Sequence, residues 1–144
     1  MNTIHIAASR EYDVLIGHGL LDELGLLVAG AVDAKTAAIV SDDSVFALYG
    51  KRAAAALERA GFRVVSFVFP HGESSKNLTV YGQVLNFLCE NRVSRTDVVV
   101  ALGGGVVGDL AGFAAATYLR GIRFIQVPTT LLAMVDSSVG GKTA

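Results

Sequence analysis

Apolar residues follow two alternating patterns along this chain: short continuous runs, and longer segments in which they recur every three or four residues. Continuous runs are typical of strands buried on both faces, and the helical recurrence is typical of the helices that cover them. The predicted strands of this kind are 37–40, 62–69, 98–102 and 122–127. Because they alternate with helical segments, they predict a mainly parallel, Rossmann-like α/β sheet with helices on both faces.

The predicted helices carry recognisable start and stop signals. Helices are predicted at 20–28, at 46–60 and from Asn77 through Leu88. The glycine-rich segment 103–112 leads into a further, alanine-rich helix, and Thr129 and Thr130 begin a last one that continues through Met134. The polar cluster 41–44 can cap the second of these helices, and Gly61 can end it. The residues of the third helix that are predicted to share one apolar face are Leu78, Tyr81, Leu85 and Leu88.

Two short segments near the N-terminus, 3–6 and 12–16, have the pattern of exposed strands rather than of buried ones. Ser9 and Arg10 lie between them, which predicts an N-terminal β-hairpin. We expect this hairpin at the edge of the sheet.

Composition and charge indicate one domain with no polyanionic partner. The chain has 144 residues, 12 Lys and Arg against 13 Asp and Glu, and 52% hydrophobic residues. A net charge near zero gives no electrostatic footprint for a nucleic acid or an anionic membrane surface. No apolar stretch reaches the roughly 18 residues of a membrane span, and no signal-peptide segment is evident. We therefore expect a cytoplasmic protein that binds small molecules or other proteins.

Ligands of open parallel sheets bind outside the carboxyl ends of the strands, and here one such loop is rich in glycine. The segment from Gly103 to Gly108 satisfies G-x-G-x-x-G between a predicted strand and helix. Glycines there let a pyrophosphate approach the free N–H groups of the helix start, although a tight turn with close packing fits the same pattern. The acidic residue expected about 20 positions later is absent. Asp42 is the substitute for binding ribose, and a role as a helix cap is equally compatible.

Two other loops at the same end of the predicted sheet carry polar side chains. Glu73 and Lys76 lie three residues apart within 70–76. A carboxylate can accept ribose hydroxyls and a lysine can meet phosphate oxygens, whereas a solvated turn with a surface ion pair is the simpler interpretation. Thr129 and Thr130 place two hydroxyls at a helix start, where either can be an N-cap.

Two further groups of charged residues are candidate contacts to a substrate or anion. Asp136 and Lys142 flank the serine- and glycine-rich segment 137–141, which is more typical of a substrate loop than of packing. Arg120 and Arg123 adjoin the last predicted strand and could bind an anion, although exposed surface arginines are the commoner outcome.

The histidines and the cysteine indicate no catalytic or metal centre. His5, His18 and His71 are scattered without the spacing of metal ligands. Cys89 is the single cysteine, which excludes an internal disulfide, and we expect it to be a packing residue. These residues indicate no nucleophile and no complete metal site.

The sequence resembles the 3-dehydroquinate synthase family in three blocks that occur in the same order: PHGESSK at 70–76, GGGVVGDLAGFAAATYLRGI at 103–122 and QVPTTLLAMVDSSVGGKTA at 126–144. The resemblance implies a lyase of the shikimate pathway of aromatic amino acid biosynthesis. Such an enzyme converts 3-deoxy-D-arabino-heptulosonate 7-phosphate to 3-dehydroquinate and phosphate, using NAD and a divalent metal, zinc or cobalt. It also implies that residues 1–144 are the NAD-binding α/β domain, and that the family's helical, metal-binding C-terminal domain is absent from this chain.

The resemblance also implies roles for individual residues. The implied NAD contacts are Asp42, His71, Gly72, Glu73, Ser74, Ser75, Lys76, Gly104, Gly105, Val106, Val107, Gly108, Asp109, Thr129, Thr130 and Lys142. Asp136 and Lys142 are the implied catalytic and substrate-binding residues, where nicotinamide and substrate meet. Arg120 matches an arginine that reaches the substrate phosphate of the neighbouring subunit in the family's homodimer. The family's metal ligands, a glutamate and two histidines, lie beyond the last position of this sequence, so we expect the chain to be inactive alone.

Three other functions are compatible with the same sequence. A related cyclase acting on sedoheptulose 7-phosphate would have similar NAD loops, since its distinguishing substrate residues lie outside this chain. A metal-dependent polyol dehydrogenase of the same architecture is a weaker alternative. The chain could also be a non-catalytic nucleotide-binding module.

Overall fold

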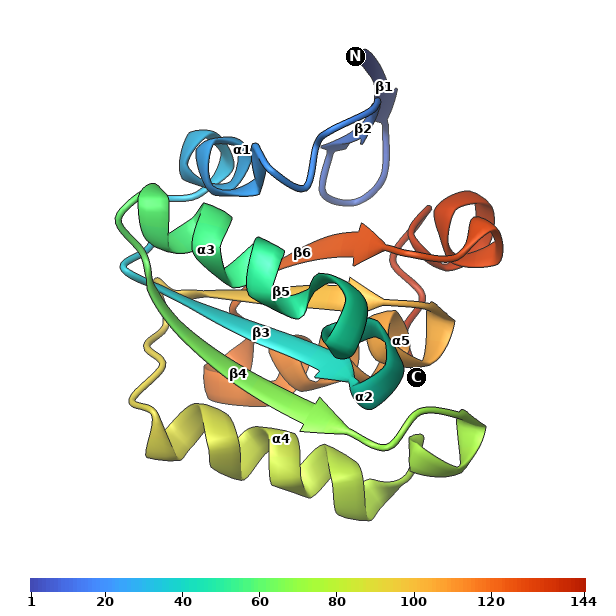
Figure 1. The fold of residues 1–144 in the computed structure, drawn as a ribbon. Helices are drawn as coiled ribbons and strands as arrows, with labels where there is room; N and C mark the ends of the chain where they lie inside the picture. Colours follow the sequence, from blue (N-terminus) through green and yellow to red (C-terminus); the bar gives the residue numbers. More distant parts are fainter.

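A four-stranded parallel sheet forms the centre of the computed structural model, which describes residues 1–144 (Figure 1). Its strands are β3 (Thr36–Asp42), β4 (Arg63–Phe69), β5 (Val98–Gly103) and β6 (Arg123–Pro128). Their order across the sheet is β4-β3-β5-β6, so that β3 and β5 are the two inner strands. Every residue of β5 is buried, as its continuous apolar sequence predicts. The predicted parallel, Rossmann-like α/β fold is therefore confirmed.

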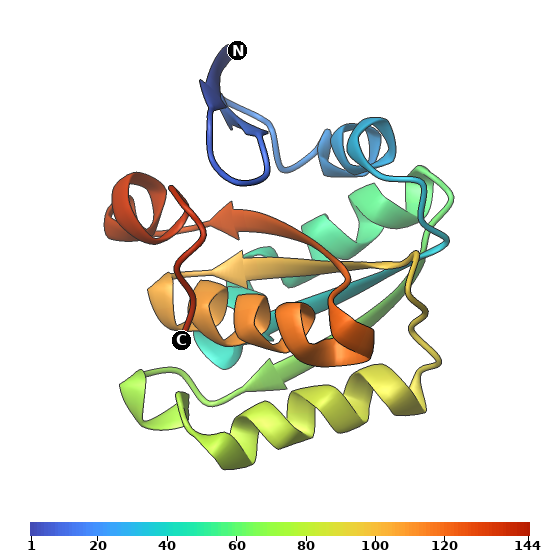
Figure 2. The same ribbon diagram turned by 180° about the vertical axis from the view of Figure 1, so that it is seen from behind.

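Helices cover both faces of the sheet (Figures 1 and 2). The helices α1 (Leu24–Ala31) and α3 (Lys51–Arg59) lie on one face, and α4 (Leu78–Glu90) and α5 (Gly105–Thr117) lie on the other. Successive strand residues point into opposite cores: Ala37 and Ile39 pack in the α1/α3 core, whereas Ala38 and Val40 pack in the α4/α5 core. Each apolar run thus contributes side chains to the core on both faces of the sheet.

Two of the predicted helix caps are present. An oxygen of the Asp42 side chain accepts a hydrogen bond from the Val45 N–H at 2.8 Å, at the start of α2 (Asp43–Val45). From there the chain continues through a π-helical segment, η1 (Phe46–Gly50), into α3. The Asn77 side chain caps α4 in the same way, by accepting from the Val80 N–H at 2.8 Å.

The predicted buried face of α4 is wrong at its first position. Leu78 is 82% exposed, and the fully buried residues of the helix are Val80, Val84 and Leu88. The cap at Asn77 places Leu78 at the first helical position, where its side chain is exposed. Tyr81 and Leu85 lie beside the core, partly buried, as predicted. The expectation that Cys89 is a packing residue is wrong, because Cys89 is exposed on the same helix.

The N-terminal hairpin forms as predicted but does not extend the main sheet. The strands β1 (Asn2–Ile6) and β2 (Tyr12–Ile16) pair with each other in an antiparallel register, as a separate two-stranded sheet. The prediction that the hairpin lies at the edge of the sheet is therefore wrong. Its residues are mostly exposed, so no apolar face drives it into register with β6.

Two predicted helix boundaries shift. The helix predicted at 20–28 begins only at Leu24, because i to i−3 backbone hydrogen bonds, such as Asp22 N–H to Gly19 O at 3.1 Å, form a turn ahead of it. The last helix begins at Leu131 and includes the π-helical segment η4 (Ala133–Ser137). No helix combines the length and apolar character that crossing a membrane requires.

Candidate functional site

The loops that follow all four parallel strands meet at one edge of the sheet. The inner strand β5 ends at Gly103, which is paired in register with Pro128 of β6, and Asp42 of β3 is paired with Phe69 of β4. The glycine-rich loop therefore lies between the loops that begin at Asp42 and at Thr129 (Figure 1). The topology thus brings together most of the residues that the sequence predicts as nucleotide contacts.

The N-terminus of α5 has free backbone donors. Gly104 is the N-cap residue and makes no side-chain cap, and the first main-chain hydrogen bond of the helix runs from Gly108 N–H to Gly104 O at 3.0 Å. The N–H groups of residues 105–107 have no partner, whereas α2 and α4 are capped by the side chains of Asp42 and Asn77. Unpaired N–H groups at a helix N-terminus favour an anion.

The backbone of this loop is closely approached by α5 at Gly103 and by the segment after β6 at Gly104. A Cβ on Gly104 would lie 3.3 Å from Thr130 Cγ2, and a Cβ on Gly103 would lie 2.5 Å from Val107 Cγ2. In contrast, a Cβ on Gly105 would have only Ser137 Oγ nearby, at 3.7 Å. Packing therefore excludes a side chain at Gly103 and leaves little room for one at Gly104, while the space beside Gly105 is open to a ligand.

Thr129 and Thr130 differ in what their hydroxyls do. The Thr129 N–H donates to Gly103 O at 3.0 Å, yet its hydroxyl is fully buried and has no hydrogen-bond partner. Thr130 Oγ1 accepts from the Ala133 N–H at 3.2 Å and therefore acts as the predicted helix cap. A buried hydroxyl without a partner is costly, which makes Thr129 the one side chain in this loop that lacks a structural explanation.

The 70–76 loop is attached to α5 by its lysine. Lys76 Nζ lies 3.3 Å from Asp109 Oδ2 and 3.6 Å from Glu73 Oε1. The hydrogen bond to Asp109 raises the pKa of Lys76, with smaller contributions from Glu73. The ion pair of Glu73 and Lys76 is thus joined to the glycine-rich loop rather than isolated on the surface. Ser75 is buried and its hydroxyl donates to the carbonyl of Pro70, which holds the turn (η2, Glu73–Ser75) in shape.

A charged pair that the sequence does not indicate joins the loops after β3 and β4. His71 Nδ1 lies 2.7 Å from Asp43 Oδ1, and the same oxygen accepts from the His71 N–H at 3.0 Å. The side-chain hydrogen bond raises the pKa of His71 and lowers that of Asp43. Asp42 uses only Oδ1 for its cap, so its other oxygen remains free to accept from a ligand.

Asp136 and Lys142 are exposed, and neither side chain makes a hydrogen bond or an ion pair within the chain. The segment between them is less free than the sequence predicts, because Ser138 is buried. The Tyr12 hydroxyl of the hairpin donates to Ser138 O at 3.1 Å and accepts from the Gly140 N–H at 2.7 Å. This three-residue contact, which we call the tyrosine clasp, fixes the candidate substrate loop to the N-terminal hairpin.

Arg120 lies at the opposite end of the sheet from these loops. It belongs to the turn η3 (Tyr118–Arg120), which precedes the amino end of β6. Leu119 and Arg120 have φ values of 49° and 67°, which is rare for residues with a side chain. Arg120 therefore does not join the residues around the glycine-rich loop. No group of three or more His, Cys, Asp and Glu side chains is placed to hold a metal ion.

Solved structures of several synthases have the same fold as this chain. A 2-deoxy-scyllo-inosose synthase complexed with carbaglucose-6-phosphate, NAD+ and Co2+ superposes with a TM-score of 0.84 and 29% identity, covering 94% of this chain and 37% of that chain. A 2-epi-5-epi-valiolone synthase from Streptomyces hygroscopicus subsp. jinggangensis 5008, with NAD+ and Zn2+ bound, gives a TM-score of 0.81 and 34% identity over 92% of this chain and 36% of that chain.

The sequence comparisons narrow this fold class to a family. A 3-dehydroquinate synthase from Streptococcus suis strain 05ZYH33 is 52% identical over 132 residues, which are 92% of this chain and 37% of that protein. The model of the family described as 3-dehydroquinate synthase N-terminal matches residues 66–144, more than half of the chain, and the chain belongs to this family. It spans about 37 to 40% of the length of the curated relatives that it matches.

Proposed function

We propose that this chain is the NAD-binding domain of a 3-dehydroquinate synthase and that the glycine-rich loop holds the cofactor's pyrophosphate. The observation that carries the proposal is the uncapped N-terminus of α5 beside the unpartnered hydroxyl of Thr129. Free N–H groups and the helix dipole suit a pyrophosphate, and a bound dinucleotide would give the buried hydroxyl a partner. The open space at Gly105 leaves room for that approach.

The surrounding loops fit the other parts of a dinucleotide. We propose that the free oxygen of Asp42 and the carboxylate of Glu73 accept ribose hydroxyls, and that Lys76 meets phosphate oxygens while Asp109 holds its ammonium group in place. The backbone and side chains of 71–75 and Thr130 would complete the walls. A bound NAD would supply a hydride acceptor and donor for the substrate carbon.

The substrate end of the site is proposed to lie at the loop held by the tyrosine clasp. Asp136 and Lys142 are exposed and unpaired there, so their charges are available to a substrate. A lysine near a developing anion stabilises it electrostatically. Because Arg120 lies at the far end of the sheet, we propose that it reaches a substrate only across a homodimer of the whole protein.

The residues of this chain do not fit the divalent metal that the solved relatives contain. We propose that the metal site belongs to the part of the relatives that this chain does not span, and that residues 1–144 alone have no turnover. An assay of phosphate release from 3-deoxy-D-arabino-heptulosonate 7-phosphate with NAD and zinc tests this. Turnover by the isolated chain at a rate typical of enzymes would refute it.

The assignment to 3-dehydroquinate synthase rather than to a sibling cyclase is supported by the identities. They are 52% to a 3-dehydroquinate synthase, against 29% and 34% to the two solved synthases of other names. A cyclase acting on sedoheptulose 7-phosphate remains the second candidate. Offering both sugar phosphates to a protein in which this chain is joined to its metal domain would separate the two activities.

The cofactor site is tested by adding a side chain to the open glycine. Gly105→Val should abolish NAD binding measured by calorimetry while leaving the circular dichroism spectrum native, because its Cβ meets no backbone of the protein. Gly82→Val is the matched control, since Gly82 also lies in a helix with nothing within 4 Å of its Cβ position. Equal NAD affinity in the two folded variants would contradict the proposed site.

A further inference from the structure

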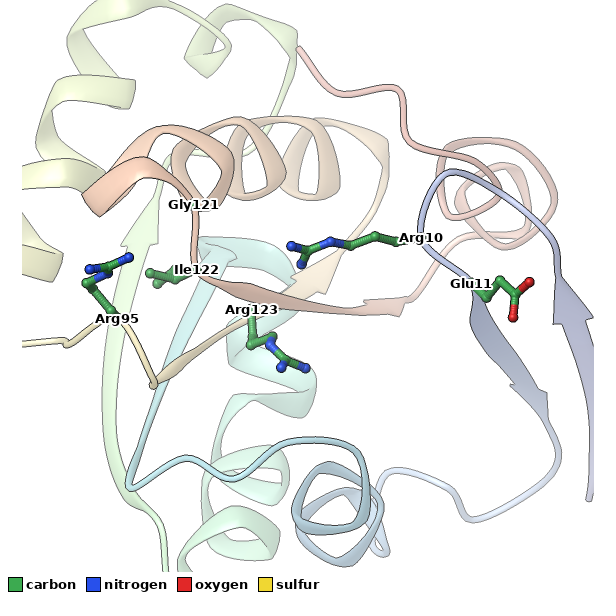
Figure 3. A pocket seen from close by; sticks show the side chains of 6 residues that line it. All are labelled: Arg10, Glu11, Arg95, Gly121, Ile122 and Arg123. Carbon is green, nitrogen blue, oxygen red and sulfur yellow. The ribbon is translucent and has the colours of Figure 1, made fainter.

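A hollow lies at the amino end of the sheet, away from the glycine-rich loop. It has a volume of about 410 Å³ and is lined by Arg10, Glu11, Arg95, Gly121, Ile122 and Arg123. Figure 3 shows Arg10 extending from the loop of the hairpin toward the start of β6, with Arg95 beyond Ile122. Three separate segments of the chain therefore supply its arginines: the hairpin loop, the turn before β5 and the first residue of β6.

The three guanidinium groups have no partner in the protein. Arg10, Arg95 and Arg123 make no side-chain hydrogen bond and no salt bridge. Three other arginines do have partners: Arg52 and Arg59 donate to Asp22, and Arg63 donates to Thr36 and Asn91.

The one carboxylate of the hollow does not neutralise the arginines. Glu11 Oε2 lies 3.5 Å from His5 Nε2, on the hairpin itself, and no arginine nitrogen lies within salt-bridge distance of it. Figure 3 shows the Glu11 side chain turned away from Arg95 and Ile122. Three positive charges against one negative charge leave the hollow electropositive although the whole chain has a net charge of −1.

We propose that this hollow, which we call the arginine pocket, binds a tetrahedral oxyanion such as phosphate. Guanidinium groups have a planar fork of donors that matches phosphate oxygens, and several of them around one anion relieve their mutual repulsion. The bound anion would tie the hairpin, through Arg10, to the amino ends of β5 and β6. The pocket is distinct from the nucleotide site because it lies at the opposite end of the strands.

The tyrosine clasp connects the hairpin that carries Arg10 to the candidate substrate loop. Arg10 and Tyr12 are two residues apart on the hairpin, and the hydroxyl of Tyr12 makes the hairpin's only hydrogen bonds to the rest of the chain. An anion that fixes Arg10 against β6 would restrict the hairpin and hence the Gly140 amide. Anion binding should therefore slow hydrogen exchange at Gly140.

Calorimetric titration with inorganic phosphate at fixed ionic strength tests the pocket. Removing one guanidinium, in Arg95→Gln or Arg123→Gln, should weaken phosphate binding about tenfold, because each removes charge-assisted hydrogen bonds. Arg92→Gln is the matched control, since Arg92 is also exposed and unpaired but lies outside the pocket. Sulfate should compete with phosphate, and acetate should compete far less.

Several outcomes would overturn the proposal. Phosphate binding that is absent at tens of millimolar would do so, and so would equal affinities in Arg95→Gln and Arg92→Gln, which would place the anion elsewhere, such as at the start of α5. Acetate competing as well as sulfate would contradict a tetrahedral oxyanion. Native circular dichroism spectra of all variants are required for these comparisons, and the conservative variant Arg95→Lys should restore part of the affinity.

Discussion

Replacing the buried carboxylate of Asp97 should destabilise the protein more than any comparable change of surface charge. Asp97 is 4% exposed and precedes β5, the inner strand that leads to the glycine-rich loop. Its Oδ1 accepts from the N–H groups of Lys35 and Thr36 at 3.2 and 2.9 Å, and its Oδ2 accepts from the Ser94 N–H at 2.8 Å. One side chain thus fastens the amino ends of the two inner strands.

The size of the effect follows from these three hydrogen bonds. In Asp97→Asn the amide has a single oxygen, so at best Lys35 and Thr36 keep their acceptor while the Ser94 N–H faces an NH2 group. Losing this hydrogen bond to a charged acceptor costs about 2 kcal/mol. For a domain of this length, that free energy corresponds to a fall in Tm of roughly 7 °C.

The pH dependence provides a second measure of the same interaction. Burial alone would raise the pKa of Asp97, but the hydrogen bonds from Ser94, Thr36 and Lys35 outweigh it and hold the pKa below the usual 3.8. The stabilisation from the carboxylate is therefore complete above about pH 5, begins to fall as the pH approaches the ordinary pKa of 3.8, and is lost as the pH falls through the lower, folded-state pKa. The stability difference between wild type and Asp97→Asn should narrow between pH 5 and pH 3.

Urea denaturation followed by circular dichroism at pH 7, 5, 4 and 3 measures both effects. Asp33→Asn is the control, because Asp33 is exposed and makes no hydrogen bond, yet its substitution changes the net charge equally. If the two variants unfold at the same urea concentration at pH 7, or if the difference for Asp97→Asn is constant down to pH 3, the role assigned to this carboxylate is wrong.

Three further substitutions test other contacts. Gly25→Ala should destabilise the chain by about 1 to 3 kcal/mol in thermal unfolding, because the new Cβ would lie 2.0 Å from the Ala56 carbonyl oxygen and force α1 away from α3. Gly30→Ala, in the same helix, places its Cβ in open space and should leave the stability unchanged. Thr129→Val should leave the chain as stable or more stable, because it removes an unpartnered buried hydroxyl, while weakening NAD binding; unchanged NAD affinity would count against the proposed contact. Tyr12→Phe removes the two hydrogen bonds of the tyrosine clasp, each of which contributes roughly 0.5–1.5 kcal/mol to stability. Hydrogen exchange at the Gly140 amide should therefore become about tenfold faster. An unchanged exchange rate would mean that the clasp does not hold the loop.

The parts of the fold that depend on local pattern could be predicted from the sequence. The strand 98–102 is apolar throughout because it is covered on both faces, and the caps at Asp42 and Asn77 are local to their helices. The position of the hairpin could not be predicted, because its few contacts with the body depend on one tyrosine hydroxyl.

The candidate site also has features that the sequence could predict and features that it could not. The loops at the carboxyl ends could be predicted, since the topology of a parallel sheet brings them together. The hydrogen bonds from Lys35 and Thr36 to Asp97 and the pair of His71 with Asp43 could not, because they join residues far apart in the sequence that belong to no motif. The one sequence signal for the role of Asp97 is that this carboxylate directly precedes a buried strand.

The tyrosine clasp also has a consequence for the order in which the chain folds. Tyr12 and Ser138 are separated by 126 positions, so their hydrogen bond closes a loop that contains the whole parallel sheet. Contacts of such long sequence separation gain free energy only after the intervening segments are in place. During synthesis the hairpin emerges before the segment that it contacts, and the two are joined only after the sheet between them has formed. The residues around Asp136 and Lys142 should therefore become ordered later than the four strands of the sheet.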